Sequence, residues 1–331
     1  MPKTVCVAGA SGLVGSNIVK ACLARGYRVH GTMRDSADPA KHPYLMALPG
    51  AAERLTLFDA DMSRPGDFDA PAFGCDAVFI ACLIPTYAGP SGMKATEMDL
   101  QQGYDEIIMP TVNGCLNILQ SAAKQGVGNA IICSSTSSTN PVPPVEYKNE
   151  TEHWSDPDQQ CAARKYTSAT KAVMEKAALR FCAEHEMRPC ILLPTLMLGP
   201  MIIPGHMDEG LMAVLSRLAK GEKGRHDKVP NGSTSMIHVD DIAALFLAAY
   251  ENPAARGRYF GVKESRHWQD IYTELQRLMP DMVMPEPLDE EPEPPTTFDF
   301  TRRDSLGVDI RPVPEILESA VAFAKNPVFG A

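Results

Sequence analysis

The sequence predicts an α/β protein built on a doubly wound parallel sheet, with a smaller C-terminal substrate lobe. Three observations support this fold class. An apolar run at 5–8 breaks into a glycine-rich turn, strand and helix patterns alternate as far as residue 195, and the strand patterns are apolar almost without interruption. Strands that alternate with helices pair in parallel, and a parallel sheet that helices cover on both faces needs such continuously apolar strands.

The predicted elements follow one another in a regular order. Six strands are expected at 5–8, 27–33, 54–58, 77–82, 130–133 and 190–194. Apolar residues recur at helical spacing between them, over 13–26, 104–126 and 158–186. Beyond Pro194 the alternation loosens, and the patterns indicate a helix over 210–221, a strand running into a helix over 236–252 and a further strand at 259–262.

This order divides the chain into two parts. We expect a dinucleotide-binding domain over residues 1–195, completed by returns to the sheet near 236–262. The stretches 196–235 and 263–331 are expected to form the substrate lobe. The acidic, Pro-rich segment 280–295 suits neither a helix nor an inner strand, so we expect an exposed loop there.

The glycine-rich turn after the first strand predicts a dinucleotide site. Gly9 permits the tight turn, Gly12 lets the backbone approach a pyrophosphate, and Gly15 lets the helix pack closely on the strand. The free N–H groups and the dipole of the next helix favour phosphate at its N-terminus. Because strand, turn and helix occur in this order, a nucleotide site is a better interpretation than an ordinary turn.

Composition narrows the expected partners and compartment. The 331 residues carry a formal charge of −10, which disfavours nucleic acid and anionic membranes as partners. The sequence shows neither a secretory signal pattern nor an apolar run that would span a bilayer, so we expect a cytoplasmic protein. The nine cysteines show no CxxC or CxxH spacing and several lie in apolar strands, which favours reduced, buried thiols and predicts no metal site.

The end of the second strand predicts the preferred cofactor. Enzymes selective for NAD place an acid there for the ribose 2′-hydroxyl, whereas those using NADP place an arginine against the 2′-phosphate. Here Met33 stands in the place of the acid and Arg34 follows, with Asp35 beside it to orient the guanidinium. The pattern favours NADP(H) over a solvated surface arginine. Asp61, after the third strand, is either an acceptor for the adenine amino group or a turn residue.

Four serines lie just past the fifth strand, at the sheet edge where ligands bind. They are Ser134, Ser135, Ser137 and Ser138. A serine at this edge can hydrogen-bond a substrate carbonyl, but serines at strand ends are equally ordinary loop residues. The residues alone leave both interpretations open.

Six motifs, taken in order, resemble one family. They read PTVNGCLNILQSA, IICSSTSSTN, ETEHWSD, LLPTLMLGP, IHVDDIAALFLAAYENP and RGRYF. Together they are similar to the dihydroflavonol reductase group of extended short-chain dehydrogenase/reductases, which includes anthocyanidin and cinnamoyl-CoA reductases. The resemblance implies a Rossmann-type sheet, NADP(H) as cofactor and a carbonyl substrate. The KNWYCYGK signature of the cinnamoyl-CoA reductases is absent.

Site residues can be transferred from this family by position. The resemblance implies that Ser135 holds the carbonyl, that Lys171 tunes the general acid and bonds the nicotinamide ribose, and that Asn140 contacts substrate. The residues expected at the cofactor are Gly9, Ser11, Gly12, Leu13, Gly15, Arg34, Asp61, Met62, Cys82, Lys171, Pro194 and Leu196.

One departure from the family concerns the general acid. The family motif is YxxxK, but Tyr166 and Lys171 are five residues apart, so Thr167 occupies the tyrosine position. On a regular helix, five residues separate two side chains by ~140°, against ~40° for four. Either a π-turn or an irregular helix start returns Tyr166 to the site, or the acid is lost and another group serves. We favour Tyr166, because Lys171 and Ser135 are retained.

The predicted function is reduction of a ketone or aldehyde on a medium-sized, largely apolar substrate, with hydride from NADPH and a proton from Tyr166. A hydroxysteroid-type dehydrogenase running the same chemistry in reverse is one alternative. A non-catalytic NADP-binding sensor is another, which the altered spacing keeps open. The loops 83–92 and 140–150 are expected to wall the substrate pocket together with the C-terminal lobe, in a monomer or homodimer.

Overall fold

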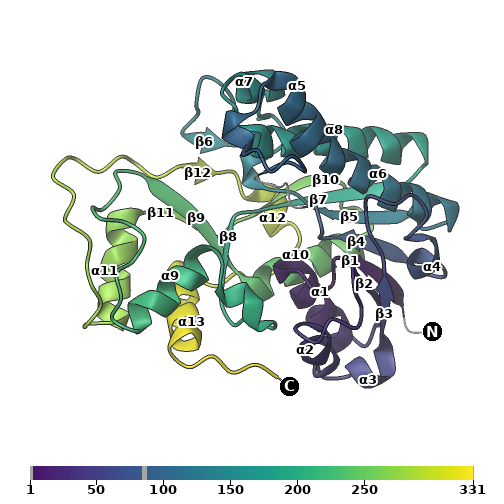
Figure 1. Cartoon of the computed structure of the whole chain (residues 1–331), viewed down its shortest axis with the longest axis horizontal. Helices are drawn as coiled ribbons and strands as arrows, with labels where there is room; N and C mark the ends of the chain where they lie inside the picture. Colours follow the sequence, from purple (N-terminus) through teal and green to yellow (C-terminus); the bar gives the residue numbers. More distant parts are fainter. Residues whose placement is uncertain (1–2, 84–87, 331) are drawn as a thin grey trace.

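A computed structural model describes residues 3–83 and 88–330 (Figure 1). Its centre is a seven-stranded sheet in which every pair of neighbours is parallel, which confirms the predicted fold class. In spatial order the strands are β10 (Gly257–Gly261), β7 (Arg188–Pro194), β5 (Asn129–Cys133), β4 (Ala77–Ile80), β1 (Thr4–Ala8), β2 (Arg28–Met33) and β3 (Leu55–Asp59).

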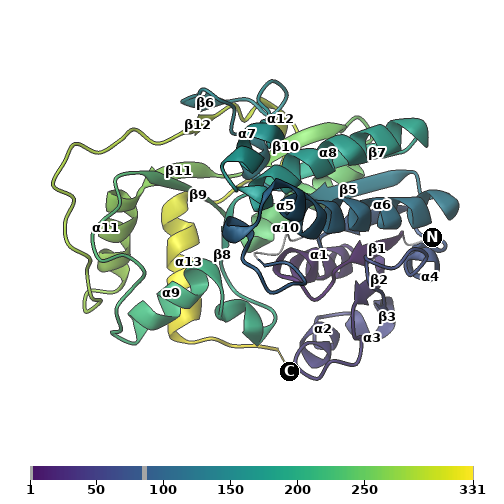
Figure 2. The same ribbon diagram turned by 45° about the horizontal axis from the view of Figure 1, so that its top comes forward.

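Helices cover both faces of this sheet (Figure 2). The main covering helices are α1 (Leu13–Ala24) and α10 (Val239–Glu251) on one face and α6 (Met109–Lys124) and α8 (Tyr166–Glu184) on the other. In β1, Val5 and Val7 enter the first core, and Cys6 and Ala8 enter the second. Alternate residues of a strand face opposite sides, so two buried faces require the unbroken apolar pattern of the sequence.

The strand order fixes where a ligand binds. Successive strands are added outward on either side of the β1–β4 pair, and α/β sheets bind ligands in the crevice at such a switch point, beyond the carboxyl ends of the strands. The glycine-rich turn leaves β1 at this edge, and the serine stretch leaves β5 one strand beyond β4. The fold therefore brings the predicted cofactor and serine segments to one edge.

The C-terminal third adds a small sheet and three helices beside this edge (Figures 1 and 2). The sheet consists of β11 (Glu264–His267), β9 (Ser233–His238) and β8 (Leu196–Leu198). The helices α9 (Gly210–Ala219), α11 (Trp268–Leu278) and α13 (Val313–Lys325) pack around a third hydrophobic core. The segment 280–295 is irregular and mostly exposed, in agreement with the sequence. The proposed domain bounds stay a prediction.

Short elements complete the fold. A two-stranded parallel pair joins β6 (Tyr147–Lys148) to β12 (Thr297–Phe298). The short helices are α2 (His42–Met46), α3 (Ala51–Arg54), α4 (Asp69–Ala72), α5 (Leu100–Gly103), α7 (Pro157–Ala162) and α12 (Thr301–Asp304), and 3₁₀ turns occur at Ala95–Glu97, Thr136–Thr139 and Pro204–Met207. Within residues 3–83 and 88–330, none of the helices has the length and apolarity needed to cross a membrane.

Two predicted helices differ from the sequence pattern. The pattern over 158–186 is interrupted, because α7 ends at Ala162 and Arg164 adopts a left-handed φ of 55° before α8 begins. The pattern over 104–126 is part of a longer helical stretch that begins with α5 and contains a π-turn at Tyr104–Ile108. The one π-turn in the described part of the chain thus lies in the neighbouring helix, not in the helix that carries Tyr166.

Candidate active site

The glycine-rich turn is held by contacts that only glycines allow. Gly9 has a left-handed φ of 83°, and a Cβ there would lie 2.7 Å from the Cβ of Cys82. A Cβ on Gly15 would lie 2.0 Å from the carbonyl oxygen of Gly9, so glycine is what lets α1 approach β1 this closely. Gly12 is the N-cap of α1 and offers no side chain to its N-terminus. The first N–H groups of α1 are therefore suited to an anionic ligand.

A cavity of about 390 Å³ lies against this turn, at the carboxyl ends of β1, β2 and β3. Its volume falls in the range of ligand pockets, and its wall joins backbone of the glycine turn to one guanidinium and one carboxylate. This donor set fits the adenosine and phosphate part of a dinucleotide. The predicted cofactor residues that line it are Gly9, Ser11, Gly12, Arg34, Asp61, Met62 and Cys82.

Asp35 does not have the expected role of orienting the Arg34 guanidinium. Arg34 lines the wall, but the Oδ1 of Asp35 accepts the N–H of Ala37 at 3.0 Å, so Asp35 is engaged in its own turn rather than orienting Arg34. The Oδ1 of Asp61 accepts both the N–H and the Oγ of Ser63 at 2.8 Å. These bonds lower the pKa of Asp61, and the charges of Arg64 and Arg34 act in the same direction. Asp61 thus has the turn role as well as a place in the cavity.

The other predicted cofactor residues lie outside the wall of this cavity. Leu13 begins α1 and packs against the third core, and Gly15 is buried within the same helix. Pro194 ends β7, and Leu196 begins β8 opposite Met236. Pro194 and Leu196 therefore lie at the carboxyl end of β7, on the edge that carries the cavity.

Ser135 and Asn140 lie on either side of a 3₁₀ turn. The Oγ of Ser135 accepts the N–H of Ser137 at 3.2 Å, which leaves its hydroxyl proton available to a substrate oxygen. The Oδ1 of Asn140 accepts a hydrogen bond from the Lys148 ammonium, so Nδ2 remains as a donor. In the other predicted pocket loop, 83–92, residues 84–87 lie outside the described residues.

Lys171 is buried on α8, and its Nζ donates to the carbonyl of Leu83. Burial lowers the pKa of this ammonium, and the neighbouring Cys133 and Glu175 oppose that shift most strongly. Leu83 directly follows Cys82 of the cofactor cavity wall, and Glu175, one helical turn after Lys171, accepts the hydroxyl of Ser134. Lys171 therefore lies between the cofactor cavity and the serines.

The π-turn predicted between Tyr166 and Lys171 is wrong, because α8 is α-helical from Tyr166 to Glu184. The phenol donates to the carbonyl of Asp99 at 2.8 Å, and the side chain is only 1% exposed. Its ring fits against Gly103, where a Cβ would lie 2.3 Å from a ring carbon. On a regular helix, ~140° separates Tyr166 from Lys171, so the two side chains enter different surroundings. The described structure does not bring Tyr166 beside Lys171.

Thr167 occupies the tyrosine position of the family motif. It lies four residues before Lys171 on the regular part of α8, so the two side chains share one face of the helix. Thr167 is half-buried, unlike the enclosed Tyr166. A hydroxyl is therefore retained at this position, although it is far less acidic than a phenol.

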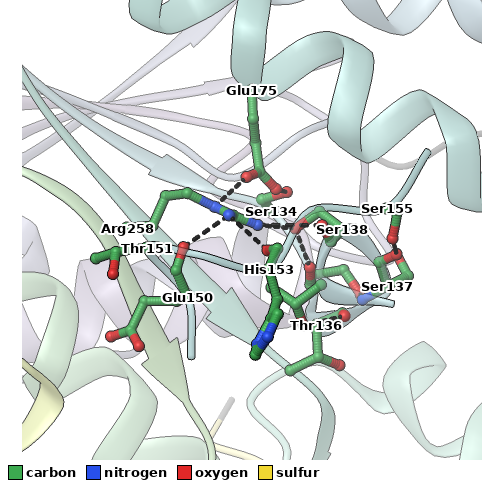
Figure 3. Close-up of polar contacts among 12 residues, drawn as sticks. Ser134, Thr136, Ser137, Ser138, Glu150, Thr151, His153, Ser155, Glu175 and Arg258 are labelled. Atoms are coloured by element: carbon green, nitrogen blue, oxygen red, sulfur yellow. Dashed lines mark hydrogen bonds and ion pairs between the residues drawn. The ribbon is translucent and has the colours of Figure 1, made fainter. Parts of the chain in front are cut away.

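A buried ion pair that the sequence analysis missed organises the serines. Figure 3 shows the side chain of Glu175 reaching from α8 to Ser134 and Arg258. The Oγ of Ser134 donates to Oε1 of Glu175, and Nε of Arg258 lies 2.8 Å from Oε2. The two charged side chains are only 0% and 4% exposed. The spacing could have predicted this pair, because Glu175 follows Lys171 by one helical turn and a carboxylate on a buried helix face requires partners.

Arg258 also binds the loop that follows the serines (Figure 3). One of its Nη atoms donates to the Oγ of Ser138 at 2.9 Å. The other donates to the carbonyls of Glu150 at 2.7 Å and His153 at 3.1 Å. One guanidinium therefore fixes both the serine segment and the end of the predicted substrate loop.

Comparisons with known proteins identify relatives of this chain. The model of the NAD dependent epimerase/dehydratase family matches residues 5–261. A putative anthocyanidin reductase of Ginkgo biloba is 30% identical over 88% of this chain and 85% of its own length. A dihydroflavonol 4-reductase of Callistephus chinensis is 32% identical over 86% of this chain and 75% of its own. The NADPH complex of Gre2 from Candida albicans has the same fold, with a TM-score of 0.78 at 20% identity over 98% of this chain and 99% of that one.

The chain therefore belongs to the NAD dependent epimerase/dehydratase family. The resemblance seen in the sequence is confirmed, as is the predicted enzyme class, an NAD(P)-dependent oxidoreductase.

Proposed function

We propose that this protein is an NADPH-dependent reductase of a ketone or aldehyde on a medium-sized, largely apolar substrate. The observation that carries the proposal is the placement of Lys171 between a dinucleotide cavity and the hydroxyl-rich segment at Ser135. The relatives named as reductases support the same reaction type. The protein is further proposed to be cytoplasmic and to act as a monomer or homodimer on a small-molecule substrate.

The preference for NADP(H) rests on Arg34. Its guanidinium lines the cavity beside Met33, where an NAD-selective enzyme carries an acid. Planar guanidinium donors suit the 2′-phosphate, which NAD lacks. The structural relative from Candida albicans is itself an NADPH complex.

We expect Arg34→Ala to weaken NADPH binding by about ten- to a hundredfold, since a charge-assisted contact contributes about 1.5–3 kcal/mol. NADH binding is expected to change little. Titration of cofactor fluorescence measures both dissociation constants, with Arg25→Ala at the exposed end of α1 as the matched control. Equal weakening of NADH and NADPH, or no weakening of either, would show that Arg34 does not read the 2′-phosphate.

Proton delivery is proposed to run through Thr167 rather than Tyr166. NADPH, when bound, supplies the hydride to the carbonyl carbon. The electron pair of the C=O bond moves to the oxygen, which Ser135 holds and which takes the hydroxyl proton of Thr167. Thr167 recovers a proton from the Lys171 ammonium, whose pKa burial lowers, and Lys171 regains one from water. The shared helical face of Thr167 and Lys171 supports this route.

The variant Tyr166→Phe distinguishes proton donation by Thr167 from proton donation by the Tyr166 phenol. Because the phenol bonds to Asp99, we expect kcat and KM to be unchanged and the free energy of unfolding to fall by about 1 kcal/mol. Steady-state kinetics and urea denaturation measure the two quantities. A folded Tyr166→Phe variant without turnover would restore Tyr166 as the acid.

The displaced phenol also favours a second candidate, an NADP-binding sensor without catalysis. A panel of aryl ketones, aldehydes, flavonoids and steroids, assayed by NADPH consumption, distinguishes the two. Turnover of a carbonyl compound supports the reductase. Tight NADPH binding without turnover on the whole panel would favour the sensor.

A further inference from the structure

Two polar segments meet at one buried carboxylate on α8. Glu175 accepts the hydroxyl of Ser134 through one oxygen and pairs with Arg258 through the other. Burial raises the pKa of Glu175, and the charge of Arg258 and the hydroxyl of Ser134 oppose that shift, so the ion pair favours the carboxylate form. Ser134 precedes Ser135. Ser138, three residues after Ser135, donates its hydroxyl to the Ser135 carbonyl at 2.9 Å and accepts from Arg258 through both its Oγ and its own carbonyl. The backbone on both sides of Ser135 is thereby fixed.

The same carboxylate lies one helical turn after Lys171 on α8, and both side chains are buried. The titratable groups that face Lys171 are Cys82 after β4, Cys115 on α6, Cys133 on β5 and Glu175 on α8. Burial raises the pKa of Cys82 to about 12 and that of Cys133 to about 11, and it raises the pKa of Cys115 as well. These thiols are therefore neutral near pH 7, which leaves the Glu175 carboxylate, paired with Arg258 at 2.8 Å, as the group of the four that favours the ammonium.

We propose that Glu175 is a positioning residue for this site: it locks the serine segment through Ser134 and Arg258, and it keeps Lys171 in the ammonium form. The inference rests on the proposed reductase function for its kinetic consequence. Its electrostatic part concerns the protein alone. Opposite charge favours the ammonium, so removing the carboxylate makes Lys171 lose its proton at lower pH.

Glu175→Gln tests the electrostatic part. In protein labelled with ¹⁵N-lysine, the Nζ signal of Lys171, assigned with Lys171→Met, is expected to titrate about one pH unit or more lower than in the unchanged protein. Glu184→Gln, at the exposed end of the same helix, is the matched control and is expected to leave the titration in place. A Lys171 titration that does not move in Glu175→Gln would overturn the proposal. Because this titration uses no substrate, it tests the proposal even when the panel of carbonyl compounds gives no turnover.

The pH dependence of kcat tests the effect of Glu175 on Lys171 during turnover. The alkaline limb of the kcat profile is expected to move to lower pH with the Lys171 titration in Glu175→Gln. A variant that lowers thermal stability but keeps the wild-type profile would mark Glu175 as merely structural and refute the proposal.

Ser134→Ala keeps the proposal falsifiable if Glu175→Gln does not fold. It removes one hydroxyl from the network and leaves the charge of Glu175 in place. We expect kcat to fall about tenfold, a loss set by the misplacement of Ser135, while the Lys171 titration and the NADPH dissociation constant stay unchanged. Unchanged kcat in folded Ser134→Ala would contradict the positioning role.

Discussion

Arg258→Met is expected to lower the free energy of unfolding by about 3–5 kcal/mol, because it leaves the buried carboxylate of Glu175 without its cation. The substitution also removes the guanidinium that donates to the carbonyls of Glu150 and His153. Inside the protein, carbonyls that lose a hydrogen bond cost further stability. Urea denaturation followed by circular dichroism measures the change. Against a total stability of about 5–15 kcal/mol for a typical protein, this is a large fraction.

Two further variants identify the cause of that loss. Arg277→Met, which breaks the exposed Arg277–Glu274 pair on α11, is expected to change stability little, since solvent screens it. Removing both charges of the buried pair in Arg258→Met/Glu175→Leu is expected to recover much of the loss, because no charge then remains uncompensated. If Arg258→Met unfolded at the same urea concentration as the wild type, the pair would not stabilise the fold.

Thr167→Val is expected to lower kcat by about 10²–10⁴-fold, the usual contribution of a positioned proton donor. Valine keeps the shape of threonine but has no hydroxyl to pass a proton from Lys171 to the carbonyl oxygen. The dissociation constant of NADPH is expected to stay unchanged, because the hydroxyl acts in the transition state. Stopped-flow measurement of NADPH oxidation and fluorescence titration give the two numbers.

Thr167→Ser serves as the matched control, since it retains the hydroxyl and is expected to keep most of the activity. If Thr167→Val turned over substrate as fast as the wild type, the proton route through this position would be wrong. Comparison with Tyr166→Phe then shows whether the phenol supplies the proton instead.

Local pattern was sufficient for the sheet and for the cofactor end of the site. The strands at the centre of the fold are continuously apolar, and the three glycines stand at fixed places relative to β1 and α1, so short windows of sequence predict them. The cavity lined by Arg34 and Asp61 follows from the parallel topology, which brings the ends of successive strands to one edge.

The proton-donor end was beyond such reasoning because it depends on contacts distant in sequence. The side chain of Tyr166 is held by a hydrogen bond to the carbonyl of Asp99 and by packing of its ring against Gly103, both more than sixty residues earlier in the chain. Arg258 meets Glu175 across more than eighty residues of chain. Helical spacing indicated that Tyr166 and Lys171 diverge on a regular helix, but the sequence alone did not reveal that α8 is regular from Tyr166 onward.

The short β6–β12 pair has a consequence for anyone who exchanges substrate loops between relatives. The N–H of Thr297 donates to the carbonyl of Glu146, and the N–H of Asp299 donates to that of Lys148, both at 2.8 Å. The Nδ2 of Asn149 reaches Oδ2 of Asp299, 150 residues later, at 3.0 Å. The loop 140–150 therefore depends on contacts with the segment 296–300. A chimera that transplants 140–150 without 296–300 leaves these anchors unmatched, so a graft should carry both segments as one unit.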